Sequence, residues 1–275
     1  PTDITLACGE GGGCVLAENA AGKISIGTLT TADPNAKDFG KHTYSVASTS
    51  GFDLDGNNLV SKAGAPVDYE TTAGHMLRVE IESSDPDGLA VTRSFTVAIS
   101  DVNEPPTRIL LSSAAVDENQ AKGTRVGRLT SEDPDAGDAH TYKLDDNPVY
   151  ASDMFEVFRD TDGSQWLRTA EELDFEAGDI RTNAASGERH YPVRIRSTDK
   201  EGAFLELDVN VVVRDVAETP TNIGLTFERF DSTTPDGYLL EGEKKGTAVG
   251  NFTTVDPDLD DVHSYKLLDD GDGAF

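Results

Sequence analysis

The sequence predicts an all-β protein made of tandem Greek-key β-sandwiches, and three observations support that fold class. Apolar and polar residues alternate with a period of two in many short segments, and no segment keeps a helical period over a dozen residues. Turn sequences such as Asp55-Gly56 and Asp162-Gly163 lie between the strand-like segments. A density of about seven short strands per hundred residues is typical of a sandwich with Greek-key connections.

The clearest strand patterns occur in pairs. Residues 77–82 and 95–100 alternate apolar and polar side chains, and the pattern returns in residues 191–195 and 205–213. This alternation is typical of antiparallel strands that have one face on a core and the other face in water. Glycines that interrupt other strand-like runs predict bulges or bends. These glycines are Gly27, Gly127 and Gly250.

A repeated motif divides the chain into domains. Pro-Thr-x-Ile occurs at residues 1–4, 106–109 and 220–223, and an acidic Asp-Val-x-Glu motif precedes the last two copies at residues 101–104 and 215–218. The offsets of about 105 and 114 residues suit whole domains in tandem and are too long for solenoid units. We therefore expect repeats at residues 1–105 and 106–219, and the truncated N-terminal part of a third repeat at residues 220–275.

Acidic motifs recur at matching positions in each copy. An acidic residue follows the first strands, and an Asp-Pro pair comes later, followed by His-x-Tyr. The acidic residues are Glu18, Glu118 and Glu241, and the Asp-Pro pairs begin at Asp33, Asp133 and Asp256. Carboxylates that recur at every domain junction indicate a site for a hard cation.

The composition limits the partners that this chain can bind. Acidic residues outnumber basic ones 51 to 23, which gives a formal net charge of −28. Such a surface repels nucleic acid and anionic membranes. No stretch of 18 apolar residues is present, so we expect no membrane insertion. A generally acidic, solvated surface explains part of the charge excess but not the matched positions of the carboxylates.

Cys8 and Cys14 are the only cysteines, and they bracket a short glycine-rich loop. Such a loop can fold back far enough to join the two thiols, and a disulfide indicates an oxidising, extracellular location. Two free thiols are the alternative. A zinc site is disfavoured because no histidine stands beside the thiols.

The motifs taken together resemble tandem cadherin repeats. An acidic residue after the first strand, Asp-aromatic-Glu, Asp-x-Asn-Glu at the end of a strand, and Asp-Pro-Asp follow one another in fixed order. The segment from Asp133 to Tyr142 is similar to cadherin-like domains of large bacterial surface and secreted proteins. The resemblance covers nearly the whole chain. It implies an immunoglobulin-like sandwich architecture and Ca²⁺ bound between consecutive domains.

The resemblance also implies which residues bind Ca²⁺ at two junctions. For the first junction these are Glu18, Asp68, Glu70, Asp101, Asn103, Glu104, the carbonyls of Val102 and Pro105, and Asp133, Asp135 and Asp199. For the second junction they are Glu118, Asp174, Glu176, Asp215, Val216, Glu218, Asp256 and Asp258. Ala217 stands where the family has asparagine, so we expect fewer or weaker ions there. In the family, each junction takes ligands from the preceding repeat (the upper half) and from the following repeat (the lower half). Asp33, Asn35 and Asp85 correspond to a lower half only, and we expect this half-site to be empty.

Elementary electrostatics supports a cation at these positions. Calcium takes six to eight oxygen ligands, whereas magnesium prefers a tighter octahedral shell with retained waters. Two carboxylates about 4 Å apart repel each other by ~4 kcal/mol at an effective dielectric constant near 20. Without cations, a junction is therefore expected to open or to take up protons.

Other motifs favour structural roles. Asp53–Asn57 resembles the start of an EF-hand loop, but Gly64 stands at the twelfth position, so a hairpin turn is the better interpretation. The recurring histidines, among them His42 and His140, are expected to support the Asp-Pro loops, because calcium prefers oxygen ligands. Trp166 is expected to pack in the core or at a sheet edge, with a sugar-stacking platform as the alternative. No nucleophile–base grouping is recognisable, so we expect no enzymatic activity.

The leading hypothesis is a calcium-rigidified, extracellular or cell-surface array that serves adhesion or acts as a stiff spacer. Its expected partners are Ca²⁺ and a cell-surface protein or an extracellular polysaccharide. The alternative is a carbohydrate-binding module of a polysaccharide-acting or biofilm protein, with Trp166 as the feature that supports it. A third possibility is a fibronectin-like or other immunoglobulin-like spacer that binds no metal, but it leaves the acidic repeats unexplained.

Overall fold

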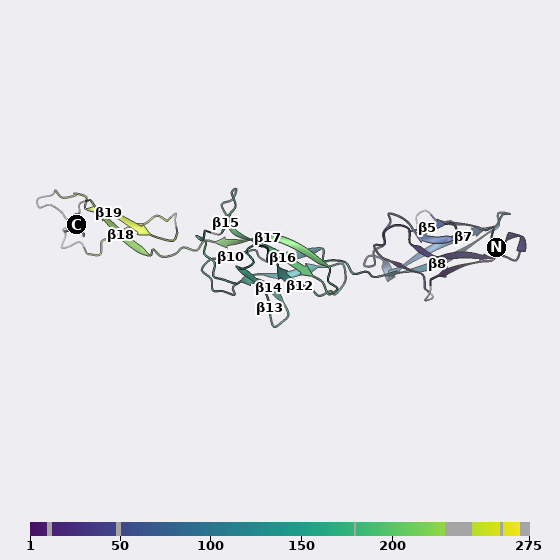
Figure 1. Ribbon diagram of the computed structural model, residues 1–275. Coiled ribbons are helices and arrows are strands. Elements are labelled where there is room, and N and C mark those ends of the chain that lie inside the picture. The colour runs from purple at the N-terminus through teal and green to yellow at the C-terminus, as the bar shows by residue number, and fades with distance from the viewer. Residues whose placement is uncertain (10–12, 48–50, 179, 229–243, 259–260, 270–275) are drawn as a thin grey trace. The chain divides into compact units, whose positions relative to one another are not determined.

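The chain folds into strands joined by turns. The computed structural model describes residues 1–9, 13–47, 51–178, 180–228, 244–258 and 261–269 (Figure 1). Among these residues the helices are short 3-10 turns, η1 (Ala36–Asp38) and η2 (Ala73–His75), and none is long and apolar enough to cross a membrane. The predicted all-β fold class is confirmed. The predicted acidic position Glu241 lies outside the described residues.

The first sandwich consists of two four-stranded sheets. One sheet contains, in order, β1 (Asp3–Cys8), β3 (Ser25–Ala32), β6 (Asn58–Ser61) and β5 (Phe52–Asp55). The other contains β2 (Val15–Ala17), β8 (Ala90–Ser100), β7 (Met76–Ser84) and β4 (Thr43–Val46). The Asp55-Gly56 turn joins β5 to β6, with Asp55 paired to Asn58, as predicted. Each sheet combines one hairpin, β5–β6 or β7–β8, with neighbours that are not consecutive in sequence, such as β3 and β6, as in a Greek key.

A single apolar cluster lies between these two sheets. The buried residues are Ile4, Ile26, Leu29, Phe52 and Leu59 from one sheet and Leu16, Val79, Ile81 and Val97 from the other. In β7 every second residue turns toward the cluster, as its period-2 pattern predicts. Burial of one such aliphatic side chain contributes roughly 1.5–3 kcal/mol, so this cluster is the main source of stability of the sandwich.

The second sandwich repeats the same strand order. One sheet contains β13 (Phe155–Arg159), β14 (Gln165–Thr169), β11 (Arg125–Glu132) and β9 (Arg108–Leu111). The other contains β10 (Ala115–Asp117), β17 (Phe204–Arg214), β16 (Arg189–Thr198) and β12 (Thr141–Leu144), and the short β15 (Arg181–Thr182) pairs with β16. Inside it, the rings of Phe155 and Tyr191 meet edge to face with centroids 6.0 Å apart.

The third copy contributes an antiparallel pair, β18 (Asn222–Phe227) and β19 (Gly250–Val255). This pair is the counterpart of β1–β3 and β9–β11. Thr2, Thr107 and Thr221 each donate a backbone hydrogen bond to the partner strand at the same place, to Ala32, Glu132 and Val255. The repeated Pro-Thr motif therefore marks the start of the first strand in each copy.

One parallel strand pair in each sandwich decides where the acidic residues gather. The short strand β2 runs parallel to β8, and β10 runs parallel to β17. Because parallel strands end at the same edge of a sheet, Glu18 and Asp101 leave their strands side by side. The amide of Glu18 donates to the carbonyl of Ser100 at 3.1 Å, and Glu118 makes the same bond to Arg214.

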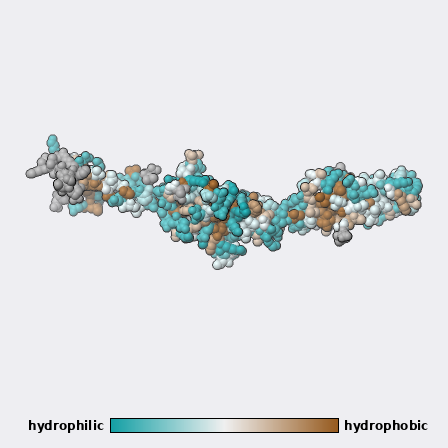
Figure 2. Space-filling model, in the orientation of Figure 1, coloured by the Kyte–Doolittle hydropathy of each residue, from teal (hydrophilic) through white to brown (hydrophobic). Residues whose placement is uncertain are grey.

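The chain divides into two compact units that cut across the sandwiches. The first unit contains residues 1–109, 131–141 and 197–205, and the second unit contains the remainder. The residues predicted for the first junction all fall in the first unit, and those predicted for the second junction all fall in the second unit. Hydrophilic side chains cover much of the face that Figure 2 shows, in keeping with the net charge of −28.

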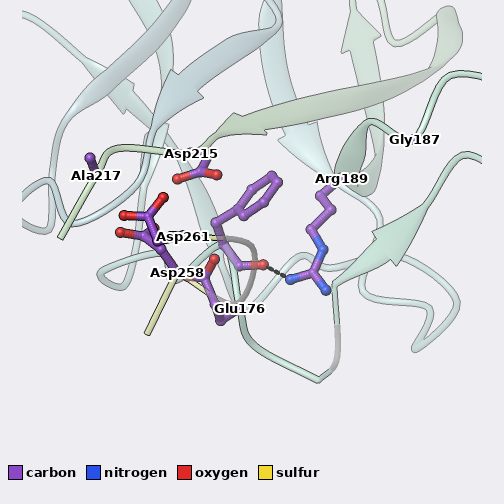
Figure 3. A pocket seen from close by; sticks show the side chains of 8 residues that line it. Glu176, Gly187, Arg189, Asp215, Ala217, Asp258 and Asp261 are labelled. Atoms are coloured by element: carbon purple, nitrogen blue, oxygen red, sulfur yellow. Dashed lines mark hydrogen bonds between the residues drawn. The ribbon is translucent and has the colours of Figure 1, made fainter. Parts of the chain in front are cut away.

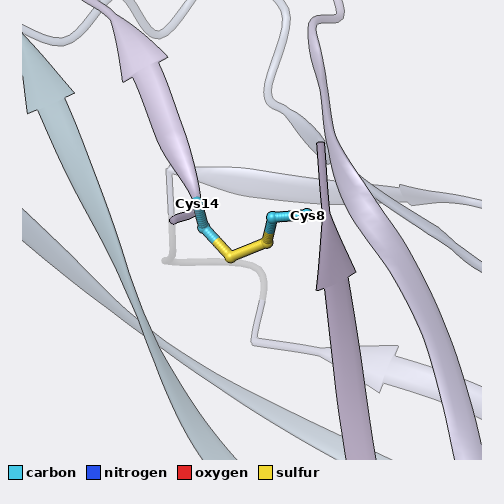
Figure 4. Close-up of a disulfide and its surroundings, with 2 residues drawn as sticks. All are labelled: Cys8 and Cys14. Carbon is cyan, nitrogen blue, oxygen red and sulfur yellow. A yellow bond between two sulfur atoms is a disulfide. The ribbon is translucent and has the colours of Figure 1, made fainter. Parts of the chain in front are cut away.

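The predicted disulfide is present and joins Cys8 at the end of β1 to Cys14 just before β2 (Figure 4). The two Cα atoms are 5.1 Å apart. The bond ties the two sheets together at the point where the chain crosses from one to the other. Residues 10–12 of the connecting loop lie outside the described residues.

The predicted bulges at Gly27 and Gly127 are confirmed, whereas β18 and β19 pair up to Gly250 without a register shift. The pairing register shifts between Ser25 and Gly27, and again between Arg125 and Gly127. A Cβ atom on Gly127 would lie 2.3 Å from the carbonyl oxygen of Ser113, and one on Gly27 would lie 2.6 Å from that of Ala7. Glycine is required at these positions because two backbones approach too closely for any side chain.

We predict that Gly127→Ala lowers the free energy of unfolding by about 1–3 kcal/mol, because the new methyl group meets backbone atoms that cannot yield. Chemical denaturation of the full chain measures the loss. Gly178→Ala is the matched control, since nothing lies within 4 Å of a Cβ atom at that position. Equal stability of the two variants would show that the close approach at Gly127 does not constrain the sequence.

Candidate metal centre

Glu18 forms the buried base of the first carboxylate group. Its side chain follows β2 and is 2% exposed. One carboxylate oxygen accepts the amide of Tyr69 at 2.7 Å, and the other accepts the amide of Val102 at 2.8 Å. These two bonds fix the orientation of the carboxylate and draw the segment around Tyr69 and the segment after β8 toward the same point.

Four further carboxylates surround Glu18. One oxygen each of Glu18, Asp68 and Glu70 lie within 4.8 Å of one another, and so do oxygens of Glu70, Asp101 and Asp135. Glu70 is common to both sets, so the sets form one continuous group. The sequence analysis predicted each of these residues as a ligand, and the structure brings them together.

The group has the electrostatics of an anion cluster. Local desolvation by the surrounding groups, followed by the negative charges of Asp135 and Glu18, raises the pKa of the exposed Asp101 above its ordinary value. Burial, followed by the charges of Glu18 and Asp101, raises the pKa of Glu70. The pKa of Glu104 is raised by burial despite a hydrogen bond from Asn19. Each of these groups is therefore less stable as an anion than it would be in water.

The segment after β8 is hydrogen-bonded to loops of the second repeat that belong to the same compact unit. The side-chain amide of Asn103 donates to Asp199 at 3.0 Å, and the backbone amide of Glu104 donates to Asp135 at 2.8 Å. Burial by itself would raise the pKa of Asp199. Hydrogen bonds to its carboxylate, beginning with the one from Asn103, outweigh burial and lower the pKa. Ligation by the carbonyls of Val102 and Pro105 stays a prediction.

Asp133 lies in a neighbouring set of carboxylates. One oxygen each of Asp133, Asp135 and Asp138 lie within 4.8 Å of one another. Asp135 thus belongs both to this set and to the group around Asp101. Asp138 was not among the predicted ligands. Burial, followed by the charges of Glu201 and Asp133, raises its pKa.

The second carboxylate group repeats the first. Glu118 is fully buried and accepts the amides of Phe175 at 2.7 Å and Val216 at 2.8 Å, as Glu18 does at its own position. One oxygen each of Glu118, Glu176 and Asp215 lie within 4.8 Å of one another. The predicted ligands Glu118, Glu176 and Asp215 are therefore brought together.

A cavity of about 360 Å³ opens beside this group. Figure 3 shows the carboxylates of Glu176, Asp215, Asp258 and Asp261 around the same space. Local desolvation, followed by the charges of Asp258 and Glu118, raises the pKa of the exposed Asp215. Arg189 also lines the cavity, but its guanidinium donates to the carbonyl of Phe175.

The remaining predicted residues of the second group are connected by hydrogen bonds from backbone amides to aspartate carboxylates. The amide of Glu218 donates to Asp258 at 2.7 Å, which matches the bond from Glu104 to Asp135. Asp174 accepts the amide of Glu176 at 2.8 Å. Asp256 accepts the amide of Asp258 at 3.1 Å. Asp174 and Asp256 thus shape the loops, and their role as ligands stays a prediction.

The recurring histidines contact the first aspartate of each Asp-Pro loop. The Nε2–Oδ2 distances are 3.1 Å for His42 and Asp33, 2.7 Å for His140 and Asp133, and 2.8 Å for His263 and Asp256. The expectation that the histidines act as polar supports of these loops is confirmed. Each pair fixes the rotamer of its aspartate.

The donor set fits a hard cation. The oxygens Glu176 Oε2, Asp258 Oδ1 and Asp138 Oδ2 are buried and have no hydrogen-bond partner among the described residues. Buried polar atoms without partners are costly, and buried anions more so. Carboxylate oxygens are the ligands that Ca²⁺ takes, so a bound Ca²⁺ would satisfy them.

The fold and these groups define a class of protein: tandem Greek-key sandwiches with clustered carboxylates where one sandwich follows another. Comparison with known proteins shows which family has this combination. Residues 112–214 match the family model of the cadherin domain. The family match therefore covers the second sandwich.

Relatives extend the similarity along most of the chain. Mouse cadherin-9 is 26% identical over 265 residues, which cover 88% of this chain and 31% of that protein. Human cadherin-24 is 29% identical over 224 residues, which cover 75% of this chain and 25% of that protein. The chain therefore spans less than a third of the length of these relatives. They are animal cadherins, so the narrower prediction of a bacterial surface domain gains no support from them.

Solved structures share the fold. Repeats 22–24 of mouse cadherin-23 superpose with a TM-score of 0.58 at 21% identity, covering 93% of this chain and 78% of that one. Domains 3–6 of protocadherin gamma B2 give a TM-score of 0.57 at 21% identity, covering 89% of this chain and 54% of that one. The latter are extracellular domains, in agreement with the location that the disulfide predicts.

We predict that acidification from pH 7 to about 5.5 stabilises the folded chain in calcium-free buffer. Carboxyls with raised pKa values, such as Asp101, Glu70 and Asp215, take up protons more readily when folded, so stability is lost as pH rises through their folded pKa. Asp33, whose pKa is lowered, stays ionised in both states across this window. Calorimetric melting at both pH values measures the effect.

With calcium present, acidification should instead lower the melting temperature, because protons then compete with the ion for the same carboxylate oxygens. A melting temperature that falls on acidification in calcium-free buffer would contradict the prediction.

Proposed function

We propose that this chain is a Ca²⁺-binding array of cadherin-like sandwiches, in which ions hold consecutive repeats together. The observation that carries the proposal is the convergence of Glu70, Asp101 and Asp135, with oxygens within 4.8 Å of one another. Glu70 and Asp101 belong to the first repeat, and Asp135 belongs to a loop of the second. A cation at their centre would turn mutual repulsion into attraction between the two repeats.

The proposed repeats are residues 1–105, residues 106–219 and the N-terminal part of a third repeat in residues 220–275. The repeated sheet order supports the first two, and the β18–β19 pair supports the third. Each carboxylate group uses residues on both sides of a proposed boundary. The boundary segments themselves, residues 101–105 and 215–219, supply ligands and amide donors.

The proposed ligands at the first junction are the residues that the structure groups, namely Glu18, Asp68, Glu70, Asp101 and Asp135. We include Asn103, Glu104, Asp199 and the carbonyls of Val102 and Pro105 as ligands that complete the shell. Five carboxylates in an irregular arrangement suit the variable shell of calcium better than the octahedral shell of magnesium.

At the cellular level, we propose that the array acts outside the cell, in adhesion or as a stiff spacer. The similarity to cadherins over most of the chain supports this role. The partner is proposed to be a cell-surface protein or an extracellular polysaccharide, and the function is proposed to be non-enzymatic. A bacterial surface origin rests only on the wording of the Asp133–Tyr142 segment.

The carbohydrate-binding alternative is less well supported. The guanidinium of Arg125 lies over the Trp166 ring, 4.6 Å from its centroid, and the indole Nε1 donates to Ser164 at 2.9 Å. The ring is already stacked and hydrogen-bonded within the sandwich. These contacts favour the packing role that was expected for Trp166 and leave less of the ring for a sugar.

We predict that calcium stiffens the full chain. Small-angle scattering in calcium and in chelator should show a narrower distribution of dimensions with the ion, and the melting temperature should rise, because bound ligand stabilises the folded state. Unchanged scattering together with an unchanged melting temperature would refute the proposed function.

We predict that Asp101→Asn weakens calcium binding at the first junction by about tenfold or more, because affinity follows the number of charged ligands. Calorimetric titration of the full chain measures the affinity. The matched control is Asp53→Asn, which makes the same charge change at a half-exposed residue paired with Lys23. Equal loss of affinity in both variants would mean that the effect is one of net charge only.

A further inference from the structure

A further aspartate recurs in the Asp-Pro loops and is not among the junction ligands proposed above. It stands five residues after the first aspartate of the loop in each copy. These residues are Asp38, Asp138 and Asp261, after Asp33, Asp133 and Asp256. Each donates its backbone amide to the carbonyl three residues earlier, at 3.0, 3.3 and 3.2 Å respectively. The same turn therefore places the same carboxylate in all three loops.

The loop of the first repeat shows what this carboxylate does. One oxygen each of Asp33, Asp38 and Asp85 lie within 4.8 Å of one another. All three residues are buried, with exposures of 7%, 3% and 6%. These residues come from one sandwich: Asp33 follows β3, Asp38 closes η1, and Asp85 follows β7.

The hydrogen bonds of this cluster leave part of it unsatisfied. Asp33 is held by His42 and by the amide of Asn35 at 2.8 Å. Among the described residues, no hydrogen-bond partner reaches the buried oxygens Asp38 Oδ2 and Asp85 Oδ2. Lys37, next in sequence to Asp38, instead contacts the exposed Asp87 at 2.6 Å.

The cluster concentrates negative charge where water cannot screen it. Three carboxylates are buried with oxygens within 4.8 Å of one another, and a divalent ion would balance them.

The second and third loops also place this aspartate beside other carboxylates, although the partners differ from those in the first loop. Asp138 lies within 4.8 Å of Asp133 and Asp135, and its Oδ2 is buried without a hydrogen-bond partner among the described residues. Asp261 lines the cavity of the second carboxylate group together with Asp258 (Figure 3). Two loops therefore place this aspartate in a three-carboxylate set, and the third places it at a cavity lined by carboxylates.

We infer that the aspartate five residues after the first aspartate of each Asp-Pro loop is a Ca²⁺ ligand. With this ligand the loop and its neighbouring carboxylates form a three-carboxylate site that needs no ligand from the preceding repeat. The inference rests on the proposed calcium-binding function and extends it. The cluster of Asp33, Asp38 and Asp85, expected from the sequence to be an empty half-junction, is then a working site. Each loop takes up its ion before the preceding repeat supplies ligands.

The test separates loop sites from junction sites in the full chain. Asp101→Asn combined with Asp215→Asn removes a ligand of the upper half from each junction. Native mass spectrometry counts bound Ca²⁺, and calorimetric titration gives the affinity. The inference expects this double variant to retain ions, and it expects Asp38→Asn, added to it, to lower the number of bound ions by one.

Two further variants secure the result. Asp138→Asn in the same background should remove one ion from the second loop, and it provides an independent answer if the Asp38 variant does not fold. Asp87→Asn is the matched control, because Asp87 is exposed and paired with Lys37 in the same region. It should leave the number of bound ions unchanged.

The outcomes distinguish the inference from the proposed function. If the unmodified chain binds Ca²⁺ but the double variant binds none, the inference is wrong and the proposed function stands. If Asp38→Asn and Asp138→Asn both keep the number and affinity of the ions, the inference is also wrong. If the unmodified chain binds no Ca²⁺, both the inference and the proposed function fail.

Discussion

Repulsion among carboxylates held close together is the physical constraint on which the rest of the structure depends. Glu70, Asp101 and Asp135 bring oxygens within 4.8 Å of one another, and desolvation together with neighbouring negative charges raises the pKa values of Glu70 and Asp101. At such separations each pair of charges costs a few kcal/mol, roughly 3–4 at an effective dielectric constant near 20. A domain is typically stable by only about 5–15 kcal/mol, so several such pairs need compensation. Protons or cations can compensate this repulsion. Near neutral pH a divalent ion does so while the carboxylates stay ionised.

The sandwich creates this constraint through its strand order. Parallel pairing of β2 with β8 places Glu18 beside the segment that begins at Asp101, and the amides of Tyr69 and Val102 then lock the Glu18 carboxylate. At the opposite ends of β3 and β7, Asp33 and Asp85 leave their strands together. The apolar cluster between the sheets holds both ends in place. Each sandwich can therefore present carboxylates in defined positions at both ends.

The sequence predicted the fold and most of the first carboxylate group because both depend on strand ends. Period-2 alternation located β7 and β8, and the residues just beyond them, such as Asp101, follow directly. The three-residue strands β2 and β10 carry too little periodicity to be recognised, so their parallel pairing was not foreseen. Asp38 and Asp138 were missed for a different reason. Their position depends on a backbone turn, in which each residue donates its amide to the carbonyl three residues earlier. That turn has no clear sequence signal, although the recurrence of an aspartate five residues after each Asp-Pro aspartate was visible. The Arg125–Trp166 stack joins β11 to β14 and has no local signal.

The two junction groups differ in one residue whose effect follows from the hydrogen bonds. Asn103 donates to Asp199 at 3.0 Å, which connects the segment after β8 directly to a loop of the second repeat. Ala217, at the matching position, has no side-chain donor and only lines the cavity. The second segment relies on the bond from Glu218 to Asp258, at 2.7 Å, which Glu104 and Asp135 also make in the first. Among the described residues, the first connection thus has two such direct bonds and the second has one. Because fewer direct bonds hold the second group, its geometry depends more on the bound ion, and calcium should alter the flexibility of the chain most at residues 215–218.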